Sequence, residues 1–250
     1  MASPFVRKLE YGAALTAQDC LTLESASHGS RKVAGRTTLI SEGDEPRNVH
    51  LIKEGFACRY KLLPNGKRQI MAFFVPGDIC DLHVHILGQM DHSIGTLIES
   101  DVVDLSPETI AALAANPRIN RALWWSTLVD EGTLREWLVG MGQRPTDQQT
   151  AHLFCELLAR LQAIGRAMDN SFDMPFTQEE LADALGVTIV HANRTLMALR
   201  GHDLIRIEGR RLIVADPERL RQFCDFDANY LHLADRQHGL DRRVGGGISV

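Results

Sequence analysis

The sequence lacks long hydrophobic runs, clustered cysteines and an excess of positive charge. No apolar stretch approaches the roughly 18 residues of a membrane-spanning helix, and the first residues do not have the basic-then-apolar order of a signal peptide. The five cysteines are odd in number and form no Cys-x-x-Cys pair, which disfavours a disulfide scaffold, a zinc ribbon and a redox dithiol. We therefore expect a cytoplasmic protein without a membrane partner.

Charge and size narrow the class of protein further. The formal net charge is −5, from 27 Lys and Arg against 32 Asp and Glu, so any polyanionic partner must be met by a local patch. The 250 residues, 44% of them hydrophobic, match an ordinary folded protein with two domains.

Glycines punctuate the first half of the chain at regular intervals. They recur at spacings of 12, 11 and 11 residues, at Gly43, Gly55, Gly66 and Gly77. Strand-like runs lie between them at residues 49–52, 56–60 and 70–75, and such spacing is typical of an all-β sandwich or barrel. Pro64-Asn65-Gly66 predicts a hairpin turn, because Asn-Gly tolerates the positive φ of a tight turn. We expect β structure from about residue 33 to 105.

Helical patterns flank this β region. A helix is expected over residues 9–28, and Ser-Pro at 106–107 predicts a helix start after the last strand. Residues 119–141 show a longer helical pattern, for which two interpretations stay open. The helix covers an open face of the β structure, or it pairs with a second copy of the chain. The stripe available for pairing is Trp124, Leu128 and Leu134.

Residues 142–147 mark the best domain boundary, because they place a proline and polar residues between two helical patterns. A helix is expected from 147 to 168, with Thr146 as its N-cap. Its polar side is expected to carry His152, Glu156 and Arg160.

Residues 176–199 have the residue chemistry of two short helices joined by a tight turn. Thr177 and Glu180 predict a capping box at the start of the first helix. Gly186 suits the left-handed conformation that ends this helix, and Thr188 suits the N-cap of the second. The inner side is apolar, at Leu181, Ala182, Leu185, Ala192, Leu196 and Leu199. This pattern predicts a helix-turn-helix.

The outer side of the second helix carries side chains that can reach nucleic acid. These are Ile189, Val190, His191, Asn193, Arg194 and Met197. An exposed arginine can make a bidentate contact to guanine, valine can pack on a thymine methyl group, and histidine or asparagine can bond base edges or phosphate. The functional interpretation is direct base readout led by Arg194, and the alternative is a solvated helix surface.

A basic hairpin follows the second helix. Residues 204–207 and 211–214 alternate as strands around a glycine, which predicts a small wing. Over residues 188–214 five arginines stand against two acids, a local charge of +3 in an acidic chain. We expect Arg210 and Arg211 to contact DNA phosphates.

Elements in this order resemble the Crp/Fnr superfamily of bacterial transcription regulators. The resemblance covers about residues 38–220 and is most specific at 40–44, 60–70, 74–78 and the helix-turn-helix. It implies an α+β fold with a jelly-roll-like β-roll sensor, a long dimerisation helix and a C-terminal winged helix-turn-helix. The corresponding divisions are an N-terminal helical segment (1–32), the β-roll (33–116), the dimerisation helix (117–142), the DNA-binding domain (146–224) and a C-terminal tail (225–250).

The resemblance also implies a function without catalysis. It implies a homodimer that reads a palindromic site on double-stranded DNA with a recognition helix around residues 188–200, and it allows contact with RNA polymerase. It places Thr188, Val190, His191 and Arg194 in the DNA-contacting stretch. Val190 falls where many members carry a glutamate that contacts a base, so the recognised sequence should differ from theirs.

The effector does not carry over from the family. Members that bind cyclic nucleotides have a Gly-Glu pair and a later Arg-Ser/Thr-Ala, whereas this chain reads Gly77-Asp78 and Asp91-His92-Ser93-Ile94. A phosphodiester without that arginine would lose its charge-assisted bonds, so cAMP binding is not expected. An iron-sulfur cluster is not expected either, because only Cys20 lies in the N-terminal segment.

Ligand-type side chains gather at one place in the β region. The candidate effector pocket consists of Asp81, His83, His85 and His92. On a strand His83 and His85 would point to the same face, a spacing that suits a metal or haem ligand. The alternative, which we favour, is that they lie in a loop at the mouth of the pocket. Gly77 followed by His83-Val84-His85 also resembles the first cupin motif, but Gln89 stands at the carboxylate position and no second motif follows. We expect no metal, and a cupin-type metal-dependent enzyme and a ligand-independent regulator remain the alternative functions.

Overall fold

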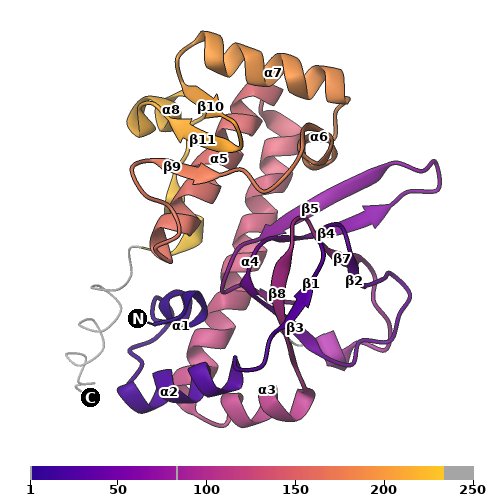
Figure 1. The fold of residues 1–250 in the computed structure, drawn as a ribbon, viewed down its shortest axis with the longest axis vertical. Coiled ribbons are helices and arrows are strands. Elements are labelled where there is room, and N and C mark those ends of the chain that lie inside the picture. The colour runs from indigo at the N-terminus through magenta and orange to yellow at the C-terminus, as the bar shows by residue number, and fades with distance from the viewer. Residues whose placement is uncertain (1, 83, 234–250) are drawn as a thin grey trace, which may run out of the picture.

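In the computed structural model, which describes residues 2–82 and 84–233, eight short strands fold into two antiparallel four-stranded sheets (Figure 1). The first sheet has the order β1-β8-β3-β6 and the second β2-β7-β4-β5. The strands are β1 (Arg31–Val33), β2 (Thr38–Ile40), β3 (Val49–Glu54), β4 (Ala57–Leu62), β5 (Arg68–Phe74), β6 (Ile79–Cys80), β7 (Ser93–Thr96) and β8 (Ser100–Leu105). This arrangement confirms the predicted β-roll.

The β4–β5 hairpin turns where the Pro-Asn-Gly signal predicted. Gly66 has φ +79°, and the Leu63 amide donates to the Lys67 carbonyl at 2.8 Å across the turn. The hairpin projects from the roll beside the C-terminal helices (Figure 1).

The helix predicted over residues 9–28 is confirmed only over residues 17–26, because it is not continuous. The chain forms α1 (Pro4–Leu9) and α2 (Ala17–Ala26), each with its own cap at Ser3 or Thr16. Gly12 lies in the break between them and packs so closely on α4 that an added Cβ would stand 2.8 Å from the Trp125 Cβ. Tertiary packing and the capping box at Thr16 therefore split the helical pattern in two.

Two helices follow the roll, as predicted. Ser106 caps α3 (Pro107–Ala114), and Asn116 caps α4 (Pro117–Gln143), a helix of 27 residues. One side of α4 packs into the core of the roll, and the helix then continues to the C-terminal helices (Figure 1). The roll-covering interpretation of the long helix is thus confirmed.

The helix predicted over residues 147–168 is shorter and differently buried. α5 (Thr146–Ala163) has Pro145 at its N-cap, and it ends before Gly165, whose φ is +72°. Its expected polar side is wrong at two positions, because His152 and Glu156 are 5% and 0% exposed. Helix periodicity placed these polar residues on one side of α5, but it could not show that other elements of the fold cover that side.

The C-terminal part confirms the winged helix-turn-helix. Its elements are β9 (Ser171–Asp173), α6 (Gln178–Leu185), α7 (Ile189–Gly201), β10 (Ile205–Glu208), β11 (Arg211–Val214), α8 (Pro217–Phe223) and the 3-10 turn η2 (Ala228–Leu231). Strands β9, β10 and β11 form a small sheet in which the β10–β11 hairpin is the wing. Residues 225–233, assigned above to the tail, pack through η2 against α4 and α5, with Tyr230 and Leu231 buried. The expected loose segment at 241–250 lies outside the described residues.

Two hydrophobic cores meet along β5. Phe74 faces the roll interior with α1 and the start of α4, whereas Phe73 faces the DNA-binding side and stacks on Phe176 at a centroid distance of 4.8 Å. The roll residues Phe56, Ile70 and Phe73 therefore share one hydrophobic core with the C-terminal helices. None of the helices in the described part of the chain is both long and apolar enough to cross a membrane.

Candidate functional site

The helix-turn-helix has the local geometry that its residues predict. Thr177 Oγ1 accepts from the Glu180 amide at 3.2 Å, and Glu180 Oε2 accepts from the Thr177 amide at 2.7 Å. Gly186 ends α6 with φ +68°, and Thr188 Oγ1 accepts from the His191 amide at the start of α7. These caps fix the turn, so the outward face of α7 is determined by the burial of its inner face.

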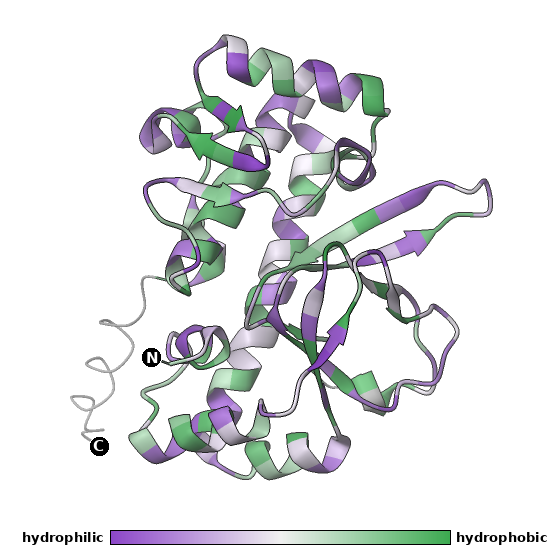
Figure 2. Ribbon diagram, in the orientation of Figure 1, coloured by the Kyte–Doolittle hydropathy of each residue, from purple (hydrophilic) through white to green (hydrophobic). Residues whose placement is uncertain are grey.

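The outward face of α7 presents an arginine between two apolar side chains. Ala192, Leu196 and Leu199 are buried with Thr195, as predicted for the inner side apart from the threonine. Val190, Arg194 and Met197 lie opposite, and Val190 and Met197 are 69% and 70% exposed. His191 and Thr188 are also exposed, whereas Asn193 is half-buried. The ribbon of α7 accordingly alternates between hydrophobic and hydrophilic bands (Figure 2).

Arginines lie on and near this face, and Met197 lines a surface groove with Arg200, Arg206, Asp203 and Glu208. Arg194, Arg200, Arg206 and Arg210 have no ion-pair partner within the described ranges. Arg211 differs, because its Nε and Nη2 donate to Ser171 Oγ at 3.0 and 2.6 Å and so tie the wing to β9. The α7 face and the wing thus offer guanidinium groups without an ion-pair partner in the described ranges, and such groups bind DNA phosphates and guanine bases.

Asp81 and His92 of the candidate effector pocket form a cluster of charged side chains with Arg59 and Asp130. Asp81 accepts from Arg59 Nη2 at 2.5 Å, and its other oxygen bonds His92 Nε2 at 2.8 Å. The same Arg59 Nη2 donates to Asp130 of α4 at 2.9 Å. The roll interior is therefore linked directly to the long helix.

These hydrogen bonds determine the charge states of Asp81 and His92. Burial disfavours the charged form of Asp81, but His92 and Arg59 outweigh burial and lower its pKa. Burial likewise opposes protonation of His92, and the carboxylates of Asp81 and Asp91 outweigh it and raise the His92 pKa. The cluster thus favours a protonated His92 beside an ionised Asp81.

Sequence reasoning missed Arg59 and Asp130. A signal existed for the first, since Arg59 has the same strand parity as Ala57, which faces the roll interior. A charged residue at such a position needs a buried partner. Nothing in the spacing of Asp130 on its helix showed that it would meet Arg59.

The local structure at His85 differs from the strand on which two histidines would share a face, and agrees with the loop interpretation. β6 ends at Cys80, and His85 lies in a 3-10 turn, η1 (Val84–Ile86), so the strand alternation that would align two histidines does not apply. His83 lies outside the described residues. Across the part of the chain that is described, no three His, Cys, Asp or Glu side chains come together as metal ligands.

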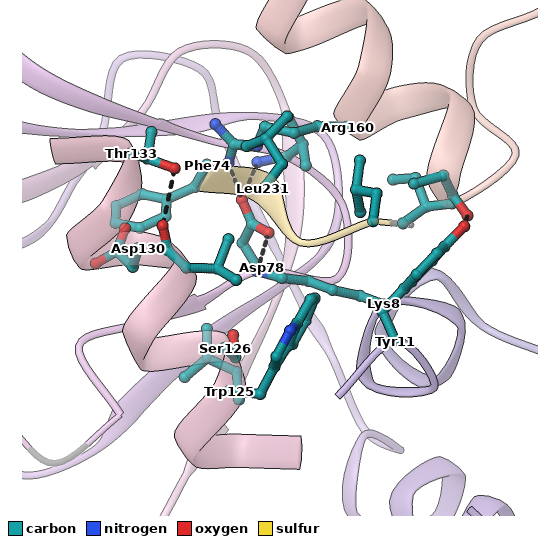
Figure 3. A pocket seen from close by; sticks show the side chains of 16 residues that line it. Lys8, Tyr11, Phe74, Asp78, Trp125, Ser126, Asp130, Thr133, Arg160 and Leu231 are labelled. Atoms are coloured by element: carbon teal, nitrogen blue, oxygen red, sulfur yellow. Dashed lines mark hydrogen bonds and ion pairs between the residues drawn. The ribbon is translucent and has the colours of Figure 1, made fainter. Parts of the chain in front are cut away.

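A second charged junction joins the roll to the C-terminal helices. Asp78 lies between Lys8 of α1 and Arg160 of α5, with 2.6 Å to Lys8 Nζ and 2.6 Å to Arg160 Nη2 (Figure 3). Burial alone would raise the pKa of the Asp78 carboxyl, but the positive charges of Lys8 and Arg160 have the larger effect and lower it. A cavity of about 40 Å³ beside it has room for a few water molecules.

The same junction continues to Glu156, which the sequence placed at the surface. This buried carboxylate accepts from Trp137 Nε1 at 2.9 Å, Arg160 Nη1 at 2.9 Å and the Tyr230 hydroxyl at 3.1 Å. Helices α4 and α5 and the turn η2 are thereby held to one carboxylate, next to the roll.

A β-roll with a charged interior, joined by a long helix to a winged helix-turn-helix with free arginines, defines a DNA-binding transcription regulator with a sensor-type domain. Comparison with known families agrees: the cyclic nucleotide-binding domain matches residues 30–116, and the Crp-like helix-turn-helix domain matches residues 148–223. The chain belongs to the Crp/Fnr superfamily of transcription regulators.

Relatives span nearly the same length. The nitrogen fixation regulation protein FixK of Bradyrhizobium diazoefficiens is 28% identical over 83% of this chain and 88% of its own. The transcriptional activator protein FnrL of Cereibacter sphaeroides is 26% identical over 85% and 86%. The structure of FixK2 from Bradyrhizobium japonicum superposes with a TM-score of 0.68 at 20% identity, covering 78% of this chain and 96% of FixK2, which shows a common fold.

Proposed function

We propose that this regulator binds a palindromic DNA site as a homodimer and inserts α7 of each protomer into the major groove. The observation that carries the proposal is Arg194, which stands at the centre of the outward face of α7 without an ion-pair partner in the described ranges. An unpaired guanidinium on this helix is suited to a bidentate contact with guanine O6 and N7.

The dimer is proposed to form along α4. Its side away from the roll carries five large apolar residues that are 47–71% exposed: Trp124, Leu128, Leu134, Leu138 and Met141. Trp124 and Leu138 are fourteen residues apart, and Leu134 and Met141 seven, which follows the heptad spacing of a coiled coil. A two-fold axis along this stripe presents two recognition helices, and half-sites about 34 Å apart place both in the major groove.

The remaining α7 and wing residues receive roles that follow from their positions. Val190 and Asn193 face base edges beside Arg194, and His191 lies at the edge of that face. The Thr188 oxygen is engaged in capping, which leaves its hydroxyl proton to donate to a phosphate. Arg210 and Arg211 on the wing neutralise phosphates without reading sequence.

The roll is proposed to act on DNA binding through α4. Arg59 bonds Asp81 of the roll and Asp130 of the helix, so a change at Asp81 or His92 alters a contact of the helix that carries the dimer stripe. The missing phosphate arginine and the single N-terminal cysteine still argue against cAMP and an iron-sulfur cluster as the signal. The internal pairing of these charges equally supports a roll that needs no ligand, which is the second candidate mode of regulation.

Three further expectations remain part of the proposal. Activity is regulatory and not enzymatic, since the relatives are transcription regulators and the cupin motif is incomplete. The protein works in the cytoplasm, where bacterial DNA lies, and contact with RNA polymerase stays a prediction. The divisions at 1–32, 33–116, 117–142 and 146–224 are kept as proposed domain boundaries, and of the proposed tail (225–250) residues 225–233 are added to the DNA-binding domain because η2 packs against α4 and α5.

Selection of bound sites from a random duplex pool tests the proposal. The purified, untagged protein should recover a two-fold palindrome, and Arg194→Ala, run in parallel, should recover none or a site relaxed at one base of each half. Recovery of an asymmetric site would overturn the dimeric mode, and recovery of the same palindrome by both proteins would overturn the assignment of α7.

A further inference from the structure

The stripe at the centre of the α7 outward face is unusually poor in hydrogen-bonding groups. Val190, Arg194 and Met197 occupy positions i, i+4 and i+7, which form one line along a helix. Of these three side chains only the arginine can donate a hydrogen bond, and none except the weak thioether of Met197 can accept one.

The surroundings identify a polyanion as the occupant of this stripe. Two apolar side chains that are about 70% exposed would, in isolation, be ordinary surface residues. Here they flank Arg194, and Met197 lines a surface groove with Arg200 and Arg206, which like Arg194 have no ion-pair partner in the described part of the chain. A partner without anionic groups would leave these guanidinium groups unmatched, whereas a DNA duplex supplies phosphates for them and base edges for the stripe.

The major groove contains one apolar group that such a stripe can recognise. This group is the C5-methyl of thymine, and cytosine carries a hydrogen at the same position. Valine and methionine contact the methyl by burial and cannot sense the O4 or N4 group beside it. The same contact therefore accepts a 5-methylcytosine as well as a thymine.

We propose that Val190 and Met197 read the C5-methyl groups of pyrimidines next to the guanine bound by Arg194. The ligand is a duplex whose half-sites contain that guanine flanked by thymine or 5-methylcytosine. The inference rests on the proposed function, and it names the chemistry by which α7 selects its site. It also makes cytosine C5-methylation of a non-consensus C·G pair a modification that increases binding.

Removal of single methyl groups from the selected duplex tests this inference. Each thymine of one half-site is replaced in turn by deoxyuridine, which removes only the methyl group, and affinity is measured by fluorescence anisotropy. Loss of one buried methyl contact should weaken binding about fourfold at one or two positions. At those positions a C·G pair should bind poorly, and 5-methylation of its cytosine should recover about the same factor.

Variants assign the contacts to residues. Val190→Ala should make binding indifferent to uracil at one position, and Met197→Ala at the other, while each protein keeps its helical circular dichroism. Arg210→Ala is the matched control, because it should weaken all duplexes alike and retain the uracil effect.

Two failures are distinguishable. Sequence-specific binding that no uracil substitution changes, or a uracil effect that survives in both alanine variants, overturns the methyl readout and leaves the proposed function standing. Absence of any sequence-specific binding overturns the proposed function and the methyl readout together.

Discussion

Arg160 of α5 and Asp78 of the β-roll form a largely buried ion pair, with 2.6 Å between Nη2 and Oδ2. Arg160 also donates to the Phe73 carbonyl and to Glu156, so one guanidinium bridges the two hydrophobic cores. The orientation of the helix-turn-helix relative to the roll thus depends on a charge that the apolar pattern does not encode.

Removal of the Arg160 guanidinium should destabilise the fold. Arg160→Met leaves the Asp78 and Glu156 carboxylates buried with fewer partners, and we expect a loss of about 3–5 kcal/mol in the free energy of unfolding measured with urea. Arg166→Met is the matched control, because its ion pair with Glu54 is more than 40% exposed on both sides. The control should lose less than about 1 kcal/mol. Equal losses in the two variants would show that the buried junction has no special role.

Two alanine variants should distinguish base contacts from phosphate contacts in the DNA-binding domain. Arg194→Ala should weaken binding to the selected site by about 1–3 kcal/mol and relax one base position. Arg210→Ala should instead weaken binding to all duplexes and reduce the slope of log affinity against log salt by about 1. Titrations at several salt concentrations measure both quantities. An Arg194→Ala protein with unchanged specificity would show that a different register of α7 faces the groove.

The α4 stripe should control the oligomeric state. Leu138 is 71% exposed, and Leu138→Asp places a charge within the proposed dimer interface. We expect this variant to sediment as a monomer at concentrations where the native chain is a dimer. Leu21→Asp on α2, at a position 63% exposed and away from the stripe, is the control and should remain dimeric. A dimeric Leu138→Asp protein would place the interface elsewhere.

Acid sensitivity should depend on His152. Burial, reinforced by nearby Arg144, lowers the pKa of His152 to about 4, so the folded protein holds the neutral imidazole. The unfolded chain takes up a proton near pH 6.5, and stability is therefore lost as pH falls from that value toward about 4. At about 1.4 kcal/mol per pH unit the loss is on the order of 3 kcal/mol. His152→Gln should flatten this limb of the stability–pH curve, and an unchanged limb would assign it to other groups.

His92 should contribute to stability with the opposite dependence on pH. Its folded pKa is raised by Asp81 and Asp91, so its contribution to stability is present at low pH and is lost as pH rises through the folded pKa. NMR titration of the imidazole should detect the raised pKa, and Asp81→Asn should bring it back toward the ordinary value. A His92 pKa that Asp81→Asn does not change would remove this residue from the roll cluster.

Local signals in the sequence were sufficient for much of the DNA-binding part. The capping box at Thr177, the left-handed Gly186 and the Thr188 cap each act within a few residues, so they could be recognised without tertiary information. The hairpin at Gly66 and the proline-started helix after Ser106 were predictable for the same reason. The N-terminal pattern failed because a close contact between Gly12 and Trp125 divides what propensity alone would join.

The sequence by itself determined the strand spacing, the caps of the helix-turn-helix, the outward face of α7 and the family, because each depends on residues close together in the chain, whereas the predicted Thr146 cap of α5 is Pro145 in the structure. Tertiary structure alone decided that Arg59 meets Asp130 and that Arg160 meets Asp78, across 71 and 82 residues. It also decided that Glu156 is buried under Trp137 and Tyr230. Such pairings depend on how separate elements pack, and a buried charge finds its partner only after the chain has folded.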